Sequence, residues 1–181
     1  AARLVFLKLA NACRAAMVLG VMAAAQANAD PLFDAQFSSF DTSPGPSVLV
    51  VGDLNSDGQL DVVVACTNRD SVSVHLGNVD PGFGVGTNYA TGDNPTGLDL
   101  GDVNGDGVLD LVVANYHSNT VSVLMGRGDG AFEAKQDFPT GLGSFGVAIG
   151  DLNLDGIADL AVANYHSNSV SVLLGQGGGM F

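Results

Sequence analysis

The sequence of 181 residues has no tryptophan, a single glutamate and only six basic residues against 19 acidic ones. Nearly all of the acid is therefore aspartate, which is a poor helix former and a frequent residue of turns and metal-binding loops. This composition favours loops that bind cations over helices held by salt bridges. A net charge of −13 also argues against nucleic acid as a partner, because the phosphate backbone would be repelled.

Cysteine is scarce, with Cys13 and Cys66 as the two instances. Basic residues precede an apolar run at 15–25, which is too short to span a bilayer, and small-residue patterns follow it. This is the layout of a secretory signal peptide. We therefore expect residues 1–29 to be cleaved and the chain to be secreted, extracellular or periplasmic, with no transmembrane segment after cleavage. Cys66 then has no disulfide partner.

Most of the chain is a repeat of 49 residues. The motif Asp-x-Asn-x-Asp-Gly-x-x-Asp begins at Asp53, Asp102 and Asp151, and the spacing needs no insertion. A glycine and a phenylalanine recur at the same interval, at Gly77 and Phe83 in the first unit. A period in the forties is typical of β-propeller blades.

Each unit predicts four short strands. In the first unit they are an apolar run at 48–52, a β-branched run at 60–66, an alternating segment at 71–74 and a glycine-rich segment at 83–89. The second and third runs recur in the later units, at 109–115, 120–124, 160–164 and 169–174. Nothing after residue 29 has a helical pattern. The predicted fold is all-β, a partial β-propeller of about three four-stranded antiparallel blades.

The predicted organisation has three parts. A signal peptide at 1–29 is followed by a lead-in strand of a preceding blade and a turn at 30–46, and 47–181 carries the three repeats. Because strand direction alternates in a meander, the acidic first loop and the third loop of each blade fall on one face, and the second loop falls on the other. Three blades cannot close a ring, so we expect further blades to be missing from this fragment.

Each acidic loop offers the oxygen ligands that calcium prefers, from side chains at loop positions one, three, five and nine and from a main-chain carbonyl at position seven. The predicted ligands are Asp53, Asn55, Asp57, Gln59 and Asp61 in the first loop, Asp102, Asn104, Asp106, Val108 and Asp110 in the second, and Asp151, Asn153, Asp155, Ile157 and Asp159 in the third. We expect about three calcium ions, one for each loop.

The acidic loops have three alternative interpretations. An EF-hand begins with the same pattern but needs a glutamate at position twelve and flanking helices, whereas Val64, Val113 and Val162 occupy that position inside predicted strands. Zinc is disfavoured because the set has no cysteine or histidine. Solvated Asp-Gly turns stay open as an alternative, although three identical spacings are hard to obtain from turn preference alone.

The second loop reads Asn-Tyr-His-Ser-Asn in two of the units. Tyr116 and Tyr165 are candidates for contact with a sugar or protein surface, because exposed aromatic rings with a polar tip suit both. His117 and His166 are interpreted as residues kept by blade duplication, with a metal or catalytic pair as the alternative. His75 is interpreted as ordinary structure.

Motifs for catalysis are missing. The sequence shows no nucleophile elbow, phosphate loop or Ser-His-Asp arrangement. The Arg-Gly-Asp tripeptide at 127–129 falls in a glycine-rich turn and is interpreted as coincidence. We predict that this chain is not itself an enzyme.

Together, the acidic loop, the apolar run after it, Val-Ser-Val-Leu-x-Gly and Gly-x-Gly-x-Phe resemble FG-GAP and VCBS repeats over about 42–181. Phe145 and Gly146 stand where a Phe-Gly pair is expected, whereas the Gly-Ala-Pro half is not legible. The resemblance implies the calcium-binding propeller of integrin α-subunits and of many secreted bacterial proteins. It implies cell adhesion, or binding of a protein or glycan. From the strand order and the Tyr-His loops we expect that partner at the face opposite the calcium loops. The alternative is the propeller portion of a secreted carbohydrate-active enzyme, a lyase or hydrolase, or a lectin.

Overall fold

The computed structural model describes residues 39–78 and 82–181. The predicted signal peptide at 1–29 lies outside the described residues, as does most of the predicted lead-in segment at 30–46. In the described part of the chain, no helix has the length and apolar character needed to cross a membrane.

The chain divides into two compact units. The smaller unit combines Ala1–Phe40 with Asn78–Gly82, and the larger combines Asp41–Gly77 with Phe83–Phe181. All the strands below belong to the larger unit, and so does every site that follows.

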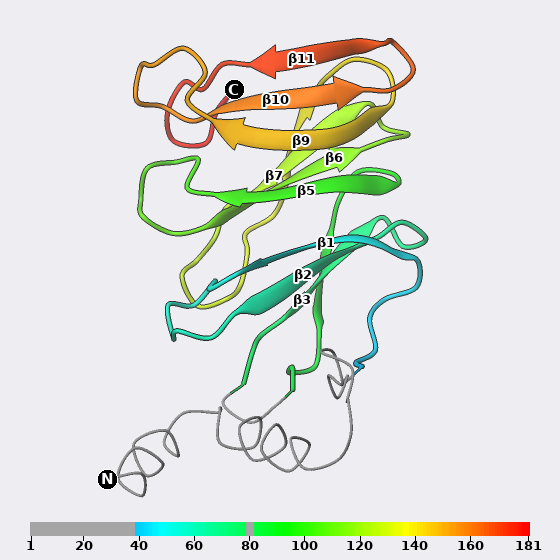
Figure 1. The fold of residues 1–181 in the computed structure, drawn as a ribbon, viewed down its shortest axis with the longest axis vertical. Coiled ribbons are helices and arrows are strands. Elements are labelled where there is room, and N and C mark those ends of the chain that lie inside the picture. Colours follow the sequence, from blue (N-terminus) through cyan, green and yellow to red (C-terminus); the bar gives the residue numbers. More distant parts are fainter. Residues whose placement is uncertain (1–38, 79–81) are drawn as a thin grey trace, which may run out of the picture. The chain divides into compact units, whose positions relative to one another are not determined.

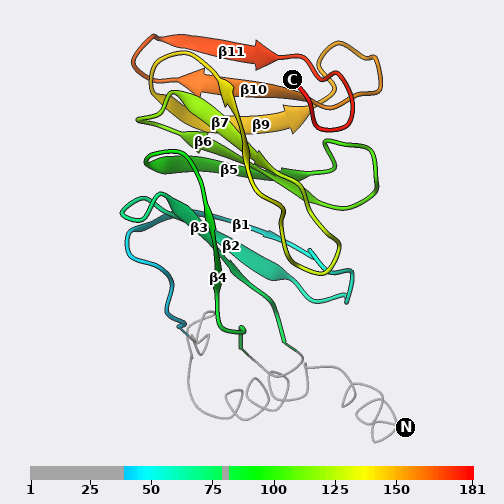
Figure 2. The ribbon, with the colours of Figure 1, turned by 180° about the vertical axis from the view of Figure 1, so that it is seen from behind.

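The larger unit is built from three antiparallel sheets (Figure 1). The first sheet contains β1 (Pro46–Gly52), β2 (Asp61–Cys66), β3 (Ser71–His75) and β4 (Thr87–Ala90). The second contains β5 (Pro95–Gly101), β6 (Asp110–Asn115), β7 (Thr120–Leu124) and β8 (Gln136–Pro139), and the third contains β9 (Ser144–Gly150), β10 (Asp159–Asn164) and β11 (Ser169–Leu173). Within each sheet, strands that are consecutive in the sequence pair with each other, and Figure 2 shows β4 beside β3 at the edge of the first sheet. Each sheet is therefore a meander, as a propeller blade is.

The predicted all-β partial propeller is confirmed, with two refinements. The glycine-rich fourth segment is not one strand: Gly77 and Phe83 form an isolated bridge, and β4 begins only at Thr87. The third sheet has three strands instead of four, because the positions equivalent to β8 would lie beyond Phe181.

The second strand of each sheet is the centre of its core. β2 and β6 are buried along their whole length, which explains why their sequences are continuous apolar runs without alternation. Adjacent sheets pack through their valines and leucines. Val63, Val72 and Val74 of the first sheet meet Leu111, Val113 and Leu124 of the second, and Val112, Val121 and Val123 of the second meet Leu160 and Val162 of the third.

The first strands of adjacent sheets lie side by side. The backbone N–H of Ile149 in β9 donates a hydrogen bond of 2.8 Å to the carboxylate of Asp99 in β5. Gly97 comes so close to β9 that an added Cβ would stand 2.7 Å from the carbonyl oxygen of Phe145. These contacts fix the stacking of the sheets, and with it the spacing between their loops.

The meander places the loops as the sequence predicts. In Figure 1 the three acidic loops, each between the first and second strands of a sheet, lie at the left end of the sheets. The second loops lie at the right end. The two candidate functional surfaces are therefore at opposite ends of the strands.

Candidate functional site

The same pattern of hydrogen bonds recurs within each of the three acidic loops. In the second loop, the carboxylate of Asp102 at position one accepts the backbone N–H groups of Asp106 and Gly107, at 3.1 and 2.8 Å. Asn104 at position three accepts the N–H of Asp106 at 2.8 Å, and its amide donates to the Asp106 carboxylate. Asp106 in turn accepts the N–H of Val108 at 2.8 Å. The equivalent bonds are present in the first and third loops.

The aspartate at position nine lies beneath its loop. Asp61, Asp110 and Asp159 are fully buried. One carboxylate oxygen accepts the N–H of loop position two, which is Val103 for Asp110 at 2.9 Å. The other oxygen accepts the N–H of the glycine that follows the third strand. This aspartate therefore connects the acidic loop before the second strand with the chain segment that follows the third strand.

The loop backbone turns in the left-handed region at two positions. Position six is glycine in all three loops, with φ between 81° and 85°. Position four is also left-handed, with φ of 58° at Ser56, 82° at Gly105 and 64° at Leu154. Only glycine adopts this region without strain, so Leu154 is the least suited of the three to its place.

At the opposite end, the second loops of the second and third sheets and the start of β9 form an aromatic cluster, made of Tyr116, His117, Phe145, Tyr165 and His166. The hydroxyl of Tyr116 and Nε2 of His166 are hydrogen-bonded at 2.8 Å, although the residues are 50 positions apart. The ring of Tyr116 contacts each of the other four rings, with centroid distances of 5.1 to 6.3 Å. The predicted ligand-contacting tyrosines are thus brought together across two sheets.

The repeating loop and hairpin match a known family. The model of the FG-GAP-like repeat matches twice, over residues 53–113 and 102–162, and the two matches together cover more than half of the chain. The chain belongs to the FG-GAP-like repeat family. Each match runs from the acidic loop of one blade into the second strand of the next, so the family assignment rests on the same segments that form the network above.

Solved structures show weaker similarity to the FG-GAP-like chain. A Tc holotoxin pore from Photorhabdus luminescens is 21% identical over 72% of this chain and 7% of its own, with a TM-score of 0.47. BBS1N, in its complex with ARL6DN, is 12% identical over 75% of this chain and 58% of its own, with a TM-score of 0.35. This chain thus spans less than two thirds of either structure. No curated protein sequence matches it.

The FG-GAP-like loops offer a donor set that fits calcium. Every predicted side-chain ligand presents oxygen, and each carboxylate oxygen of Asp102, Asp106 and Asp110 accepts one hydrogen bond from within the protein, apart from Asp102 Oδ1, which accepts two. A carboxylate oxygen has two acceptor positions, so a lone pair stays free on nearly every ligand. Within the described residues, no three histidine, cysteine, aspartate or glutamate side chains converge into a ready-made cage. The calcium assignment therefore stays a prediction.

Two carboxylates in the second loop differ in their pKa. Burial raises the pKa of Asp110, and the charges of Asp106 and Asp102 add to the rise, against the lowering effect of the N–H groups it accepts. For Asp102, burial also acts to raise the pKa, but the backbone N–H groups of the loop outweigh it and lower the value. The loop therefore favours the charged form of the outer carboxylate, which is the form that binds a cation.

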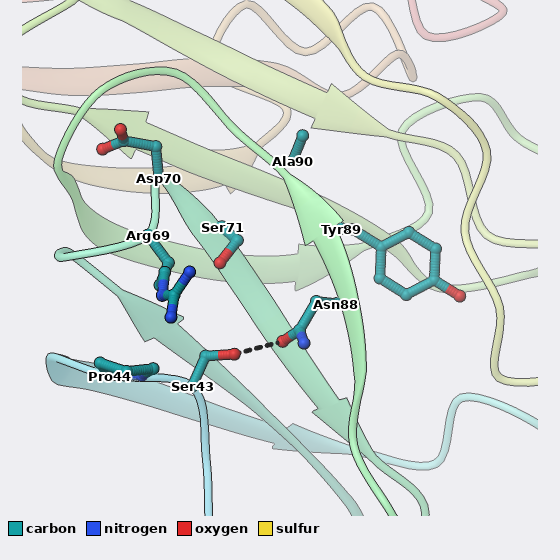
Figure 3. Close-up of a pocket in the computed structure, with 8 residues that line it drawn as sticks. All are labelled: Ser43, Pro44, Arg69, Asp70, Ser71, Asn88, Tyr89 and Ala90. Carbon is teal, nitrogen blue, oxygen red and sulfur yellow. Dashed lines mark hydrogen bonds between the residues drawn. The ribbon is translucent and has the colours of Figure 1, made fainter.

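A separate pocket of about 470 Å³ lies in the first blade and contains none of the predicted site residues. Figure 3 shows its lining, in which the hydroxyl of Ser43 donates to Oδ1 of Asn88 at 2.8 Å. Arg69 also lines this pocket and forms no salt bridge among the described residues. The Arg-Gly-Asp tripeptide lies elsewhere, in a turn where Asp129 accepts the N–H of Ala131.

Sequence reasoning missed the role of Phe145. Phe145 joins the aromatic cluster from β9, and only the stacking of β9 against the second blade brings it there. The buried Ser73 and His75 form a hydrogen bond of 2.8 Å between Oγ and Nε2, which confirms the interpretation of His75 as structural. The hydrogen bond between the aspartate at position nine and the glycine after the third strand could have been suspected from the sequence, because both residues recur in all three repeats.

Proposed function

We propose that the chain is a secreted, calcium-binding propeller module that binds a protein or carbohydrate partner, as in cell adhesion, and does not itself catalyse a reaction. The observation that carries the calcium part is the network shared by the three acidic loops. It folds each loop into one conformation and leaves acceptor positions free on its carboxylates.

Calcium has a structural role in this proposal. Each acidic loop concentrates three aspartates, whose mutual repulsion opposes folding in the absence of a cation. A bound ion would offset that repulsion and stiffen the first hairpin of its blade, so that metal binding and folding are linked. The loops face away from the aromatic cluster, and the partner is assigned to the cluster end.

The test is a thermal melting series on the full chain. With calcium in excess over chelator the melting temperature should rise, and chelator alone should lower it. Magnesium at the same concentration serves as the control, because it demands a stricter octahedral geometry and releases its water reluctantly. Equal melting temperatures in calcium, magnesium and chelator would refute the calcium role.

A further inference from the structure

Three rings of the aromatic cluster form a nearly equilateral triangle on the surface. The centroid distances are 6.2 Å between Tyr116 and Phe145, 6.3 Å between Tyr116 and Tyr165, and 6.1 Å between Phe145 and Tyr165. Phe145 is 52% exposed and Tyr165 is 66% exposed. Large rings held together in water are typical of interaction surfaces, because their burial by a partner is favourable.

The triangle is held in place before any partner arrives. Tyr116 follows β6, which is fully buried, and its hydroxyl is tied to His166 of the next blade. Its backbone N–H also donates to the carbonyl of Asn94 at 2.9 Å. The Tyr116 ring therefore loses little conformational freedom when a partner binds, which favours affinity.

Two exposed aspartates lie at the same end of the sheets as the triangle. The carbonyl of Asp93 accepts the backbone N–H of His117 at 3.2 Å, so the exposed Asp93 sits directly beside the cluster. Asp70 is also exposed, and its carboxylate accepts the N–H of Asn94, which precedes the first strand of the same blade as Tyr116. Arg69, the residue before Asp70, lines the pocket of the first blade.

We propose that this triangle, together with the aspartates Asp70 and Asp93 at the same end of the sheets, binds a lysine- or arginine-bearing segment of a partner protein. The inference rests on the proposed binding function and narrows its partner. A cation is attracted by an aromatic face within about 6 Å of the ring centroid. In a triangle with sides of this length, a cation above the centre lies within that range of all three rings.

The charge of the chain decides between a basic segment and a sugar. A net charge of −13 attracts a basic segment and accelerates its encounter, gives a neutral sugar no advantage and repels an acidic one. Calcium at the far end would neutralise the acidic loops but not Asp70 and Asp93. The basic segment is therefore the occupant that uses both the rings and the charge of this end.

The experiment measures fluorescence anisotropy of a labelled tetralysine peptide with the full chain at physiological salt. Tyr165→Ala and Phe145→Ala leave the charge unchanged and should each weaken binding about twofold to fivefold. Asp129→Asn removes a charge in the third loop, away from the triangle, and should change the affinity less than about twofold. A labelled tetraglutamine peptide is the uncharged control and should not bind.

Several results would overturn the proposal. Equal binding of tetralysine by the native chain and by Tyr165→Ala would show diffuse attraction without a site. Binding of a neutral xylotetraose that Tyr165→Ala abolishes, with no binding of tetralysine, would assign the triangle to a saccharide. Absence of any binding would also refute it. The melting temperature of the same variants with and without calcium is measured separately. A failure of the calcium role can therefore be distinguished from a failure of peptide binding at the triangle.

Discussion

The carboxylate of Asp110 accepts a hydrogen bond of 2.7 Å from the backbone N–H of Gly126, two residues after β7 ends. The other oxygen of Asp110 holds the acidic loop through Val103. One buried side chain thus connects the loop before β6 with the loop after β7. The same relationship in the other blades means that the last predicted metal ligand is also a structural residue.

Asp110→Asn tests this structural role. The amide keeps the shape of the side chain but replaces one acceptor oxygen by a donor, so one buried N–H group faces another. We expect the free energy of unfolding to fall by about 1–3 kcal/mol, measured by urea denaturation in chelator. Asp93→Asn, at an exposed position, is the control and should change it by less than about 0.5 kcal/mol. Equal stability of the two variants would contradict the role.

Gly126 is required for close approach. An added Cβ would stand 2.2 Å from the carbonyl oxygen of Leu109, a backbone atom that cannot turn away. Gly126→Ala should therefore lower the free energy of unfolding by about 1–3 kcal/mol. Gly150→Ala is the matched control, because a Cβ there meets nothing within 4 Å, and a strand alanine there should be neutral or slightly stabilising. Thermal melting of both variants in parallel tests this requirement, and an unchanged melting temperature of Gly126→Ala would contradict the need for glycine at this position.

The sequence predicted the blades because their signals are local. The 49-residue period marks the repetition of the blades, and the continuous apolar runs at β2 and β6 reflect burial of the whole strand, so both can be recognised without the fold. The Ser-Val alternation at β3 predicts the strand but not its burial, because all five residues of β3 are buried and not one face alone. The place of the acidic loops also follows from strand order alone. The break between Phe83 and the start of β4 could not be predicted, because a glycine-rich segment has a weak strand preference whether or not it forms a strand.

Contacts between blades could not be predicted in the same way. Phe145 reaches Tyr116 only because Gly97 lets β9 come close to β5, and that depends on the stacking of sheets. The aspartate at position nine was predicted as a ligand from its spacing, but its burial and its bond to Gly126 arise from the return of the chain after β7. The spacing of the motif therefore identified the aspartate, whereas its structural role depends on contacts that only the folded blade creates.

Leu154 is strained at position four of the third loop. It has φ of 64° and its side chain is 88% exposed, so no packing compensates for the left-handed backbone. Leu154→Asn should raise the free energy of unfolding by about 0.5–1 kcal/mol, because asparagine tolerates this region better. The reciprocal change Gly105→Leu, in the equivalent position of the second loop, should lower it by about 1–2 kcal/mol. If urea denaturation showed that both variants raise, or both lower, the free energy of unfolding, the strain assigned to Leu154 would be contradicted.

Asp106→Ala separates the metal role of a loop from its structure. In chelator the variant loses two exposed hydrogen bonds, from the Asn104 amide and the Val108 N–H, but it also removes the repulsion between Asp106 and Asp110. Because these effects oppose each other at an exposed position, the free energy of unfolding should change little. In calcium the variant should bind one ion fewer than the native chain by equilibrium dialysis. It should also lack the stabilisation of that site, about 1.4 kcal/mol at a free calcium concentration about ten times Kd.

The control for Asp106→Ala is Asp129→Ala in the same blade. Asp129 also accepts a backbone N–H within a turn, from Ala131 at 3.0 Å, but stands outside the acidic motif. It should therefore match Asp106→Ala in chelator and the native chain in calcium. Because the two variants remove the same charge, a difference that appears only with calcium isolates coordination from electrostatics. Native stoichiometry in Asp106→Ala would show that the second loop holds no ion, and its network would then serve only to shape the turn.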